Sequence, residues 1–131
     1  MAEHPNVARV HEYLATYRDH APEDLEPFFA DDIVWRVGGS HHLSGTYRGK
    51  DEVLAYIARS RELTGGTLSL QPDSILASDR HLAMFTHVTG ERDGKQLDAN
   101  LAQVVVLDDE GSWKEYWALS DNQESIDQFW S

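Results

Sequence analysis

The chain has no cysteine among its 131 residues. This absence excludes disulfide bonds, thiolate metal ligands and cysteine nucleophiles. The sequence also lacks a run of about 18 apolar residues, the length that a membrane-spanning helix needs. The opening segment MAEHPNVARV has neither the basic nor the apolar region of a secretory signal. We therefore expect a cytoplasmic protein.

Positive charge is scarce in this chain. It has 11 Lys and Arg residues against 23 Asp and Glu residues, which gives a formal net charge of -12. Proteins bind nucleic acids and anionic membranes chiefly through Lys and Arg contacts to phosphates. We therefore expect neither a nucleic acid nor a membrane as a partner.

Two common motifs for metals and nucleotides are missing as well. The segment HEYLA, residues 11–15, lacks the second histidine of the zinc-binding HExxH motif. The glycine-rich segment GGSHHLSGTYRGK lacks the spacing of a phosphate-binding loop. We therefore expect a protein without a metal or another cofactor.

The hydrophobic content of 40% supports a single domain over residues 1–131. In the first half, apolar residues at three- and four-residue steps predict a helix over Pro5–Asp19. PEDLEPFF, residues 22–29, predicts a short second helix, and DIVWRV, residues 32–37, predicts a strand. Another helical stripe starts at Val53 and stops before Gly65 and Gly66.

From Thr67 onward the pattern changes to strands. Four segments, TLSLQPDSILA, HLAMFTHVTGER, LDANLAQVVVL and SWKEYWALS, predict an antiparallel meander, and a short helix is expected from Asp121. The order predicts an α+β fold in which a curved antiparallel sheet packs on about three N-terminal helices and encloses a pocket. Both faces of the segment LDANLAQVVVL are partly apolar, so we expect a second subunit to cover the outer face in a homodimer.

Several phrases of the sequence carry a resemblance to a known family. FFADDIVW, SGTYRGKDEVLAYIARS, GGTLSL and WALSDNQESIDQFW resemble the SnoaL-like (polyketide cyclase-like) members of the nuclear transport factor 2-like (NTF2-like) superfamily, which are related to ketosteroid isomerases. The resemblance covers nearly the whole chain and implies their cone-shaped fold. It implies the reaction only broadly, because this fold hosts isomerases, cyclases, hydrolases and proteins without a known activity.

The resemblance to ketosteroid isomerases does not extend to their catalytic residues. Their general-base Asp falls at or near Val37 here, and their protonated Asp falls near Ala102 or Gln103. Only their helix-one Tyr has a match, in Tyr13. The SnoaL-type cyclases imply a different arrangement, in which a carboxylate assisted by histidine works in an apolar pocket without a cofactor.

The last predicted strand supplies candidate carboxylates. Side chains alternate along a strand, and Trp113, Glu115, Trp117 and Asp121 share the bulkier phase, which we expect to face inward. Asp121 is then the candidate acid or base. It also heads the capping-box pattern DNQE, so capping of the last helix is the alternative role.

Histidines supply the other candidate catalytic groups. In HLAMFTHVTG, His87 shares a phase with Phe85; if Phe85 points inward, so does His87, and an imidazole facing the pocket can exchange a proton near neutral pH. A surface histidine or a hydrogen-bonded core histidine is the alternative. His41 and His42 are adjacent, and adjacent residues of an extended chain point in opposite directions. We expect His42 to face the pocket and His41 to face solvent; for either, a solvated loop histidine is the alternative.

The sequence therefore predicts a cofactor-independent acid/base enzyme, an isomerase, cyclase or hydrolase, acting on a small hydrophobic or polyketide-like molecule. Its catalytic groups would be Asp121, His42 and His87. The alternative is a non-catalytic domain that binds a small molecule or dimerises. The expected substrate-binding residues are mostly aromatic or amide side chains: Tyr13, Tyr17, Trp35, Tyr56, Asn100, Gln103, Glu115 and Trp117.

Overall fold

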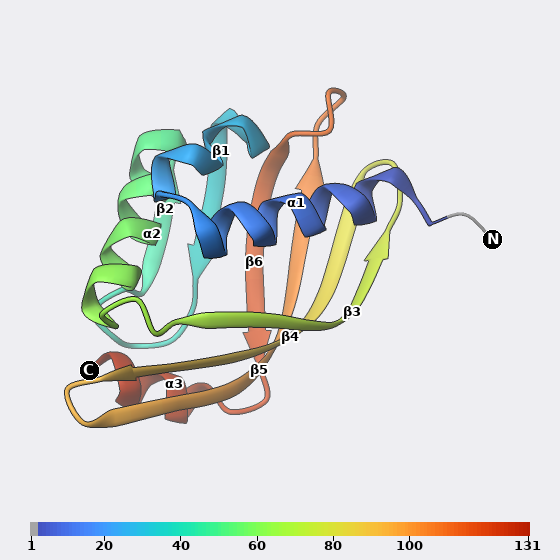
Figure 1. The fold of residues 1–131 in the computed structure, drawn as a ribbon. Helices are drawn as coiled ribbons and strands as arrows, with labels where there is room; N and C mark the ends of the chain where they lie inside the picture. Colours follow the sequence, from blue (N-terminus) through green and yellow to red (C-terminus); the bar gives the residue numbers. More distant parts are fainter. Residues whose placement is uncertain (1–2) are drawn as a thin grey trace.

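A computed structural model describes residues 3–131 of the protein. Figure 1 shows the order of the elements: α1 (Pro5–Asp19), the 3₁₀ helix η1 (Pro22–Phe28), β1 (Phe29–Val37), β2 (Gly45–Arg48), α2 (Lys50–Leu63), β3 (Ser69–Ala77), β4 (His81–Arg92), β5 (Lys95–Leu107), β6 (Trp113–Ser120) and α3 (Gln123–Trp130).

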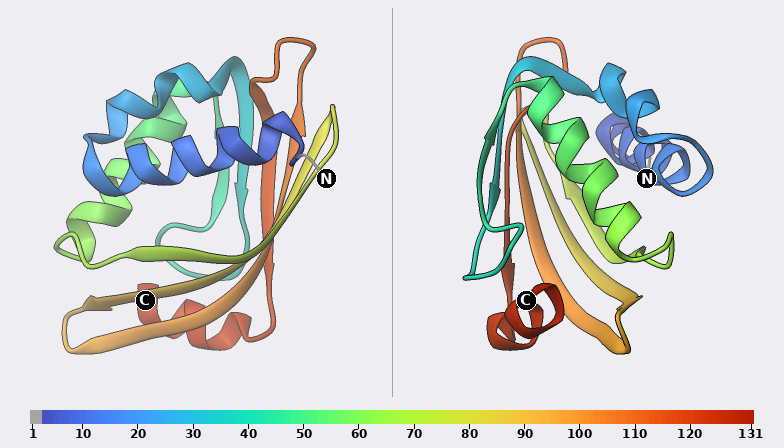
Figure 2. Two further views of the ribbon diagram at one scale, coloured as in Figure 1. Left: turned by 45° about the vertical axis from the view of Figure 1, so that its right-hand side comes forward. Right: turned by 90° about the vertical axis from the view of Figure 1, so that its left-hand side faces the viewer.

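The strands form one curved sheet in the order β2-β1-β6-β5-β4-β3. Figure 2 shows that β4 and β5 bend strongly along their length, that α1, η1 and α2 lie on one side of the sheet, and that α3 lies at its lower end. The predicted α+β architecture is confirmed, with two additions. β1 pairs with β6 in parallel, and the glycine-rich segment after β1 contributes the short strand β2.

The first helix has the predicted bounds. The ring Nδ1 of His4 accepts a hydrogen bond from the backbone N–H of Asn6, and Pro5 occupies the first turn, where a missing N–H costs nothing. The buried side chains of α1 recur at the predicted spacing: Val7, Val10, Tyr13 and Tyr17. The second predicted helix is the tight helix η1, which contains Pro27.

An extra residue in β6 changes which of its side chains face the helices. Glu115 pairs with Val106 and Trp113 with Leu107, so Lys114 has no partner on β5. Such a bulge breaks the strict alternation of side chains. Trp113 and Tyr116 consequently lie on the inner face, where both are buried. The expected inward phase of Glu115, Trp117 and Leu119 is wrong, and the Leu119 side chain is 66% exposed.

The side chains of β4 also face the opposite way from the expectation that His87 lies inside. Leu82, Met84 and Val88 are buried, whereas Phe85 is 49% exposed. His87 shares the outward phase of Phe85. In β5 the Gln103 side chain faces inward and the Asn100 side chain faces outward, so only Gln103 of these two expected ligand-binding amides is on the inner face.

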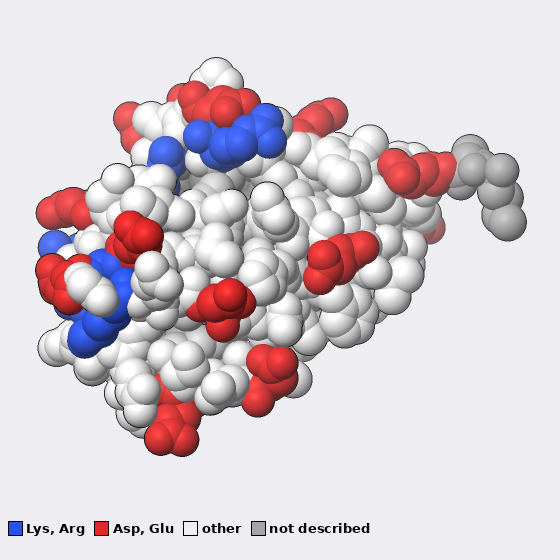
Figure 3. Space-filling view, turned by 60° about the horizontal axis from the view of Figure 1, so that its bottom comes forward, with Lys and Arg blue, Asp and Glu red and all other residues white. Residues whose placement is uncertain are grey.

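Charge is unevenly placed on the face drawn in Figure 3. Acidic side chains are scattered across this face, whereas Lys and Arg gather in two groups near its edges. No helix within residues 3–131 is both long and apolar enough to cross a membrane.

The burial pattern predicts a large contrast between two leucines. Leu82→Ala removes a side chain that is 1% exposed and leaves a cavity, so it should lower the free energy of unfolding by about 2–5 kcal/mol. The same change at Leu76, which is 60% exposed on the edge strand β3, should cost under about 1 kcal/mol. Urea unfolding of both variants measures the difference. Equal losses would contradict the assigned phase of β4.

Candidate functional site

A cavity of about 140 Å³ lies between the concave side of the sheet and the helices. Its walls are mainly aromatic and aliphatic, and they include Tyr13, Tyr17, Trp35 and Tyr56 at the positions that the sequence predicted. An engineered apolar cavity of about 150 Å³ accepts benzene. The space therefore suits a ligand portion of about one ring.

Stacked aromatic rings build one side of the cavity. The ring of Tyr116 stacks on Trp35 with centroids 3.7 Å apart, and the ring of Trp113 stacks on Tyr13 at 4.3 Å. The buried indole N–H groups of Trp35 and Trp113 have no hydrogen-bond partner within residues 3–131. Unpaired buried donors are costly, so these groups favour a ligand that carries hydrogen-bond acceptors.

The tyrosine hydroxyls of the cavity remain protonated. Burial raises the pKa of Tyr17 and Tyr116 to about 12 and also raises the pKa of Tyr13 and Tyr56. Each of these hydroxyls is therefore a neutral group that can donate its proton in a hydrogen bond at physiological pH.

A buried chain of hydrogen bonds fixes the Tyr116 hydroxyl. Thr86 Oγ1 donates to Gln103 Oε1 at 2.6 Å, and Gln103 Nε2 donates to Tyr116 Oη at 2.7 Å. All three side chains are buried. Because the Tyr116 oxygen already accepts a hydrogen bond from Gln103, its own proton is available to a ligand in the cavity.

His41, and not His42, is the histidine at the cavity. The side chain of His41 is 2% exposed and lines the wall, whereas His42 is exposed. The expectation that His42 faces inward is wrong because this segment is a turn. The Ser44 N–H donates to the His41 carbonyl at 3.1 Å, and the Leu43 N–H donates to His41 Nδ1 at 3.1 Å.

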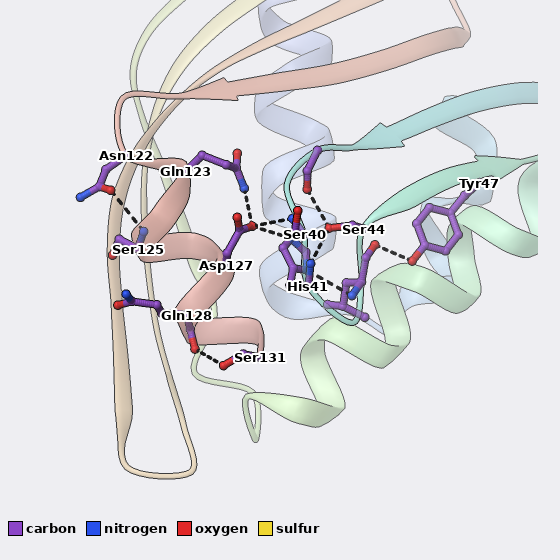
Figure 4. A network of polar contacts seen from close by, with 12 residues as sticks. Ser40, His41, Ser44, Tyr47, Asn122, Gln123, Ser125, Asp127, Gln128 and Ser131 are labelled. Carbon is purple, nitrogen blue, oxygen red and sulfur yellow. Dashed lines mark hydrogen bonds and ion pairs between the residues drawn. The ribbon is translucent and has the colours of Figure 1, made fainter.

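A polar network joins this turn to α3. Asp127 Oδ1 accepts hydrogen bonds from the Ser40 N–H and from Gln123 Nε2, both at 3.0 Å, and lies 4.0 Å from His41 Nε2 (Figure 4). Gly39 adopts a φ of +84°, and a Cβ there would collide with the Asp127 carboxylate. The turn and the helix are therefore fitted closely around His41.

The hydrogen bonds of His41 define its chemical character. Desolvation lowers the pKa of His41, although the nearby Asp127 opposes the shift, so the ring is neutral at pH 7. Nδ1 accepts from the Leu43 N–H and therefore carries no proton, which places the proton on Nε2. The N–H of His41 is therefore on Nε2, the nitrogen that lies 4.0 Å from Asp127 Oδ1. Among the cavity-lining residues in the described part of the chain, none is Asp or Glu.

Asp121 fills neither of its two expected roles. It is exposed and does not line the cavity. The cap of α3 is Asn122, whose side chain accepts from the Ser125 N–H at 3.2 Å. Asp121 Oδ2 instead lies 3.5 Å from Asn100 Nδ2 on the outer side of the sheet.

The remaining polar candidates also lie outside the cavity. His87 Nε2 is 3.1 Å from Asp98 and its Nδ1 is 3.0 Å from Asn100. Glu115 pairs with Arg36 at 3.2 Å, and the Arg36 guanidinium lies 5.9 Å from the Trp117 ring centre. Asp121 and His87 thus meet around Asn100 on the outer face, and none of the residues that the sequence assigned to catalysis, Asp121, His42 and His87, lines the cavity.

Metal ligands are not clustered in the described residues 3–131. No group of three or more His, Asp or Glu side chains there has an arrangement that could hold a metal ion.

Comparisons with known proteins place the chain among SnoaL-like proteins. A model of the SnoaL-like domain matches residues 10–116. An uncharacterized protein of Mycobacterium tuberculosis is 29% identical over 85 residues, and the match spans 64% of this chain and 65%, just under two thirds, of that relative.

Solved structures share the fold across nearly the whole chain. Bal32a, from a soil-derived mobile gene cassette, has a TM-score of 0.90 at 24% identity, with 96% of each chain covered. TerC, crystallised with polyporic acid, has a TM-score of 0.80 at 18% identity, covering 96% of this chain and 98% of TerC. Other neighbours are described as NTF2-like and as ketosteroid isomerase-like.

The environment of His41 predicts an unusual titration. Its pKa should lie below the ordinary value of 6.5, and Asp127→Asn should lower it further, because the substitution removes the charge that favours the imidazolium. Since the unfolded state takes up the proton first, the stability that His41 contributes should decline as the pH falls below about 6.5. NMR titration of the ring, with His41→Gln to assign its signal, provides the measurement. A pKa at or above 6.5 would contradict the buried position.

Proposed function

The chain belongs to the SnoaL-like domain family, and from this premise we propose that it binds a small, flat, mainly apolar molecule that carries a carbonyl oxygen. The proposal rests on one observation: an apolar cavity is lined by hydrogen-bond donor side chains whose positions are fixed by other hydrogen bonds. Tyr116 is fixed by Gln103, and His41 by the Leu43 N–H. A carbonyl oxygen is an acceptor that both donors can serve.

The cavity's size limits the class of ligand. Its volume of about 140 Å³ matches one ring with a short substituent, which is smaller than a fused multi-ring polyketide. The aromatic walls favour a flat ring, because stacked or edge-on contacts between rings add to the stabilisation from burial. TerC, which shares this fold, was crystallised with polyporic acid.

Catalysis is the second candidate function, and the Thr86–Gln103–Tyr116 chain favours it. A fixed donor in a dry cavity is what an oxyanion hole requires, since it stabilises negative charge that develops on a carbonyl oxygen. His41 would assist through its Nε2–H. Because the described wall offers no carboxylate base, the reaction that fits best is one in which the protein polarises the carbonyl and the substrate or solvent accepts the proton.

Removing one hydroxyl tests the proposed role of Tyr116. Acetophenone is a suitable probe, because it combines one ring with one carbonyl. Tyr116→Phe should weaken acetophenone binding about tenfold, the effect of one buried hydrogen bond, and should leave ethylbenzene binding unchanged. Calorimetry or ligand-observed NMR gives both affinities.

Tyr47→Phe is the matched control, because its hydroxyl donates to the Leu43 carbonyl and the residue does not line the cavity. If Tyr116→Phe weakens both probes equally, the loss comes from packing and the donor role is wrong. For any substrate that the protein turns over, an oxyanion role requires Tyr116→Phe to lower kcat by about 10²–10³.

We further propose that the outer face of the sheet forms a homodimer. Phe85, Ala102 and Leu119 stand side by side across β4, β5 and β6, and Ala83, Val104 and Trp117 form the next row. Phe85 and Leu119 are 49% and 66% exposed. Monomeric proteins rarely leave a contiguous apolar patch uncovered, and a second copy supplies a matching apolar face.

A charge placed in this patch tests the dimer. Leu119→Lys should shift the protein from dimer to monomer in analytical ultracentrifugation, because burying an unpaired ammonium in an apolar interface is costly. Gln128→Lys adds the same charge at an exposed position on α3 and should leave the dimer intact. A wild-type protein that sediments as a monomer at micromolar concentration would contradict the proposal.

A further inference from the structure

A second hollow, of about 500 Å³, lies beside the cavity, between the later part of α1, the end of α2 and the start of β3. Figure 1 shows the start of β3 running below α1 in this region. The two spaces share four wall residues: Leu14, Tyr17, Leu68 and Leu70. The cavity and the groove therefore adjoin at these four side chains, and a substituent on a ring in the cavity would reach the groove beside Tyr17.

The groove is positively charged in an acidic protein. Its walls contain Arg18, Arg61 and His11 and no Asp or Glu, although Asp and Glu outnumber Lys and Arg by 23 to 11 in the chain. Arg18 is neutralised by Asp19, with two hydrogen bonds of 3.0 and 2.9 Å. Arg61 pairs with no carboxylate within residues 3–131. Of the two arginines in the groove, Arg61 is therefore the one whose positive charge is not neutralised by an ion pair.

Arg61 is held at the boundary between the two spaces. Its Nη1 donates to the His20 carbonyl at 2.9 Å, and its guanidinium lies 5.5 Å from the ring centre of Tyr17, which lines both the cavity and the groove. Arginine has five N–H donors, and the bond to His20 uses one of them. The others suit a carboxylate, which matches the planar guanidinium in size and shape.

We propose that the groove binds the carboxylate of the ligand, so that the natural ligand is a small aromatic or alicyclic keto acid. Its ring and ketone occupy the cavity, and its carboxylate meets Arg61. The inference rests on the proposed function, because the ring must first enter the cavity. It adds the requirement that the ligand carries a negative charge, which the proposed function alone does not include.

The test compares 4-oxo-4-phenylbutanoate with its neutral amide, 4-oxo-4-phenylbutanamide, by calorimetry on the full chain. The carboxylate should bind at least tenfold more tightly than the amide, and the difference should shrink as salt is raised. Arg61→Gln should weaken the carboxylate at least tenfold more than the amide and so abolish this advantage. Arg61→Lys, which keeps the charge, should restore part of it.

Arg59→Gln is the matched control, since Arg59 lies on the same helix but pairs with Glu62 at 3.7 Å and lines neither space. It should change neither affinity. Thermal unfolding of each variant checks that loss of the bond to His20 has not unfolded the chain.

The outcomes separate the two proposals. If carboxylate and amide bind equally well, the cavity proposal stands and the anion site is wrong. The anion site is also wrong if Arg59→Gln removes the preference as strongly as Arg61→Gln. If neither probe nor acetophenone binds, the cavity proposal fails, and the keto-acid inference fails with it.

Discussion

The stacking of Trp113 on Tyr13 holds the inner face of the sheet against α1, and the stacking of Tyr116 on Trp35 joins the neighbouring strands β6 and β1 on that face. Trp113 and Tyr116 are three residues apart, so a regular strand would turn them to opposite faces. The unpaired Lys114 between them puts both rings inside. In a regular strand Trp113 would share its face with Glu115 and Trp117 and not with Tyr116. The bulge at Lys114 thus lets Trp113 and Tyr116 line the same cavity, while Glu115 stays on the outer face.

The chemistry of the cavity follows from this arrangement. Gln103 on the neighbouring strand reaches Tyr116, and Thr86 one strand further fixes the amide of Gln103. On the other side, the turn after β1 and the Asp127 network of α3 hold His41 with its proton on Nε2. Both groups are neutral at physiological pH and both offer hydrogens. The protein is acidic overall, yet no Asp or Glu is among the described residues that line its cavity.

The sequence predicts the elements well because helical and strand periodicity report burial directly. α1 has its predicted bounds, and the four C-terminal strands lie within a few residues of their predicted limits. The positions of Tyr13 and Trp35 at the cavity also follow from the pattern. Alternation fails where the backbone is irregular, at the bulge that brings in Tyr116 and at the turn that brings in His41. The local hint of the turn is the segment from Gly38 to Ser44, in which six of seven residues are Gly, Ser or His; Gly and Ser are typical of turns. The cap of α3 falls one residue after Asp121 because Asn122 also has a capping side chain.

The most direct test of this account is a crystal structure of the protein with acetophenone bound. The account predicts that the phenyl ring lies between the aromatic walls of the cavity and that the carbonyl oxygen lies about 2.7 Å from Tyr116 Oη, the usual length of an O–H···O hydrogen bond. A probe that occupies the cavity with its oxygen turned away from both Tyr116 and His41 would contradict the donor role. A cavity that stays empty at saturating probe would contradict the binding function itself.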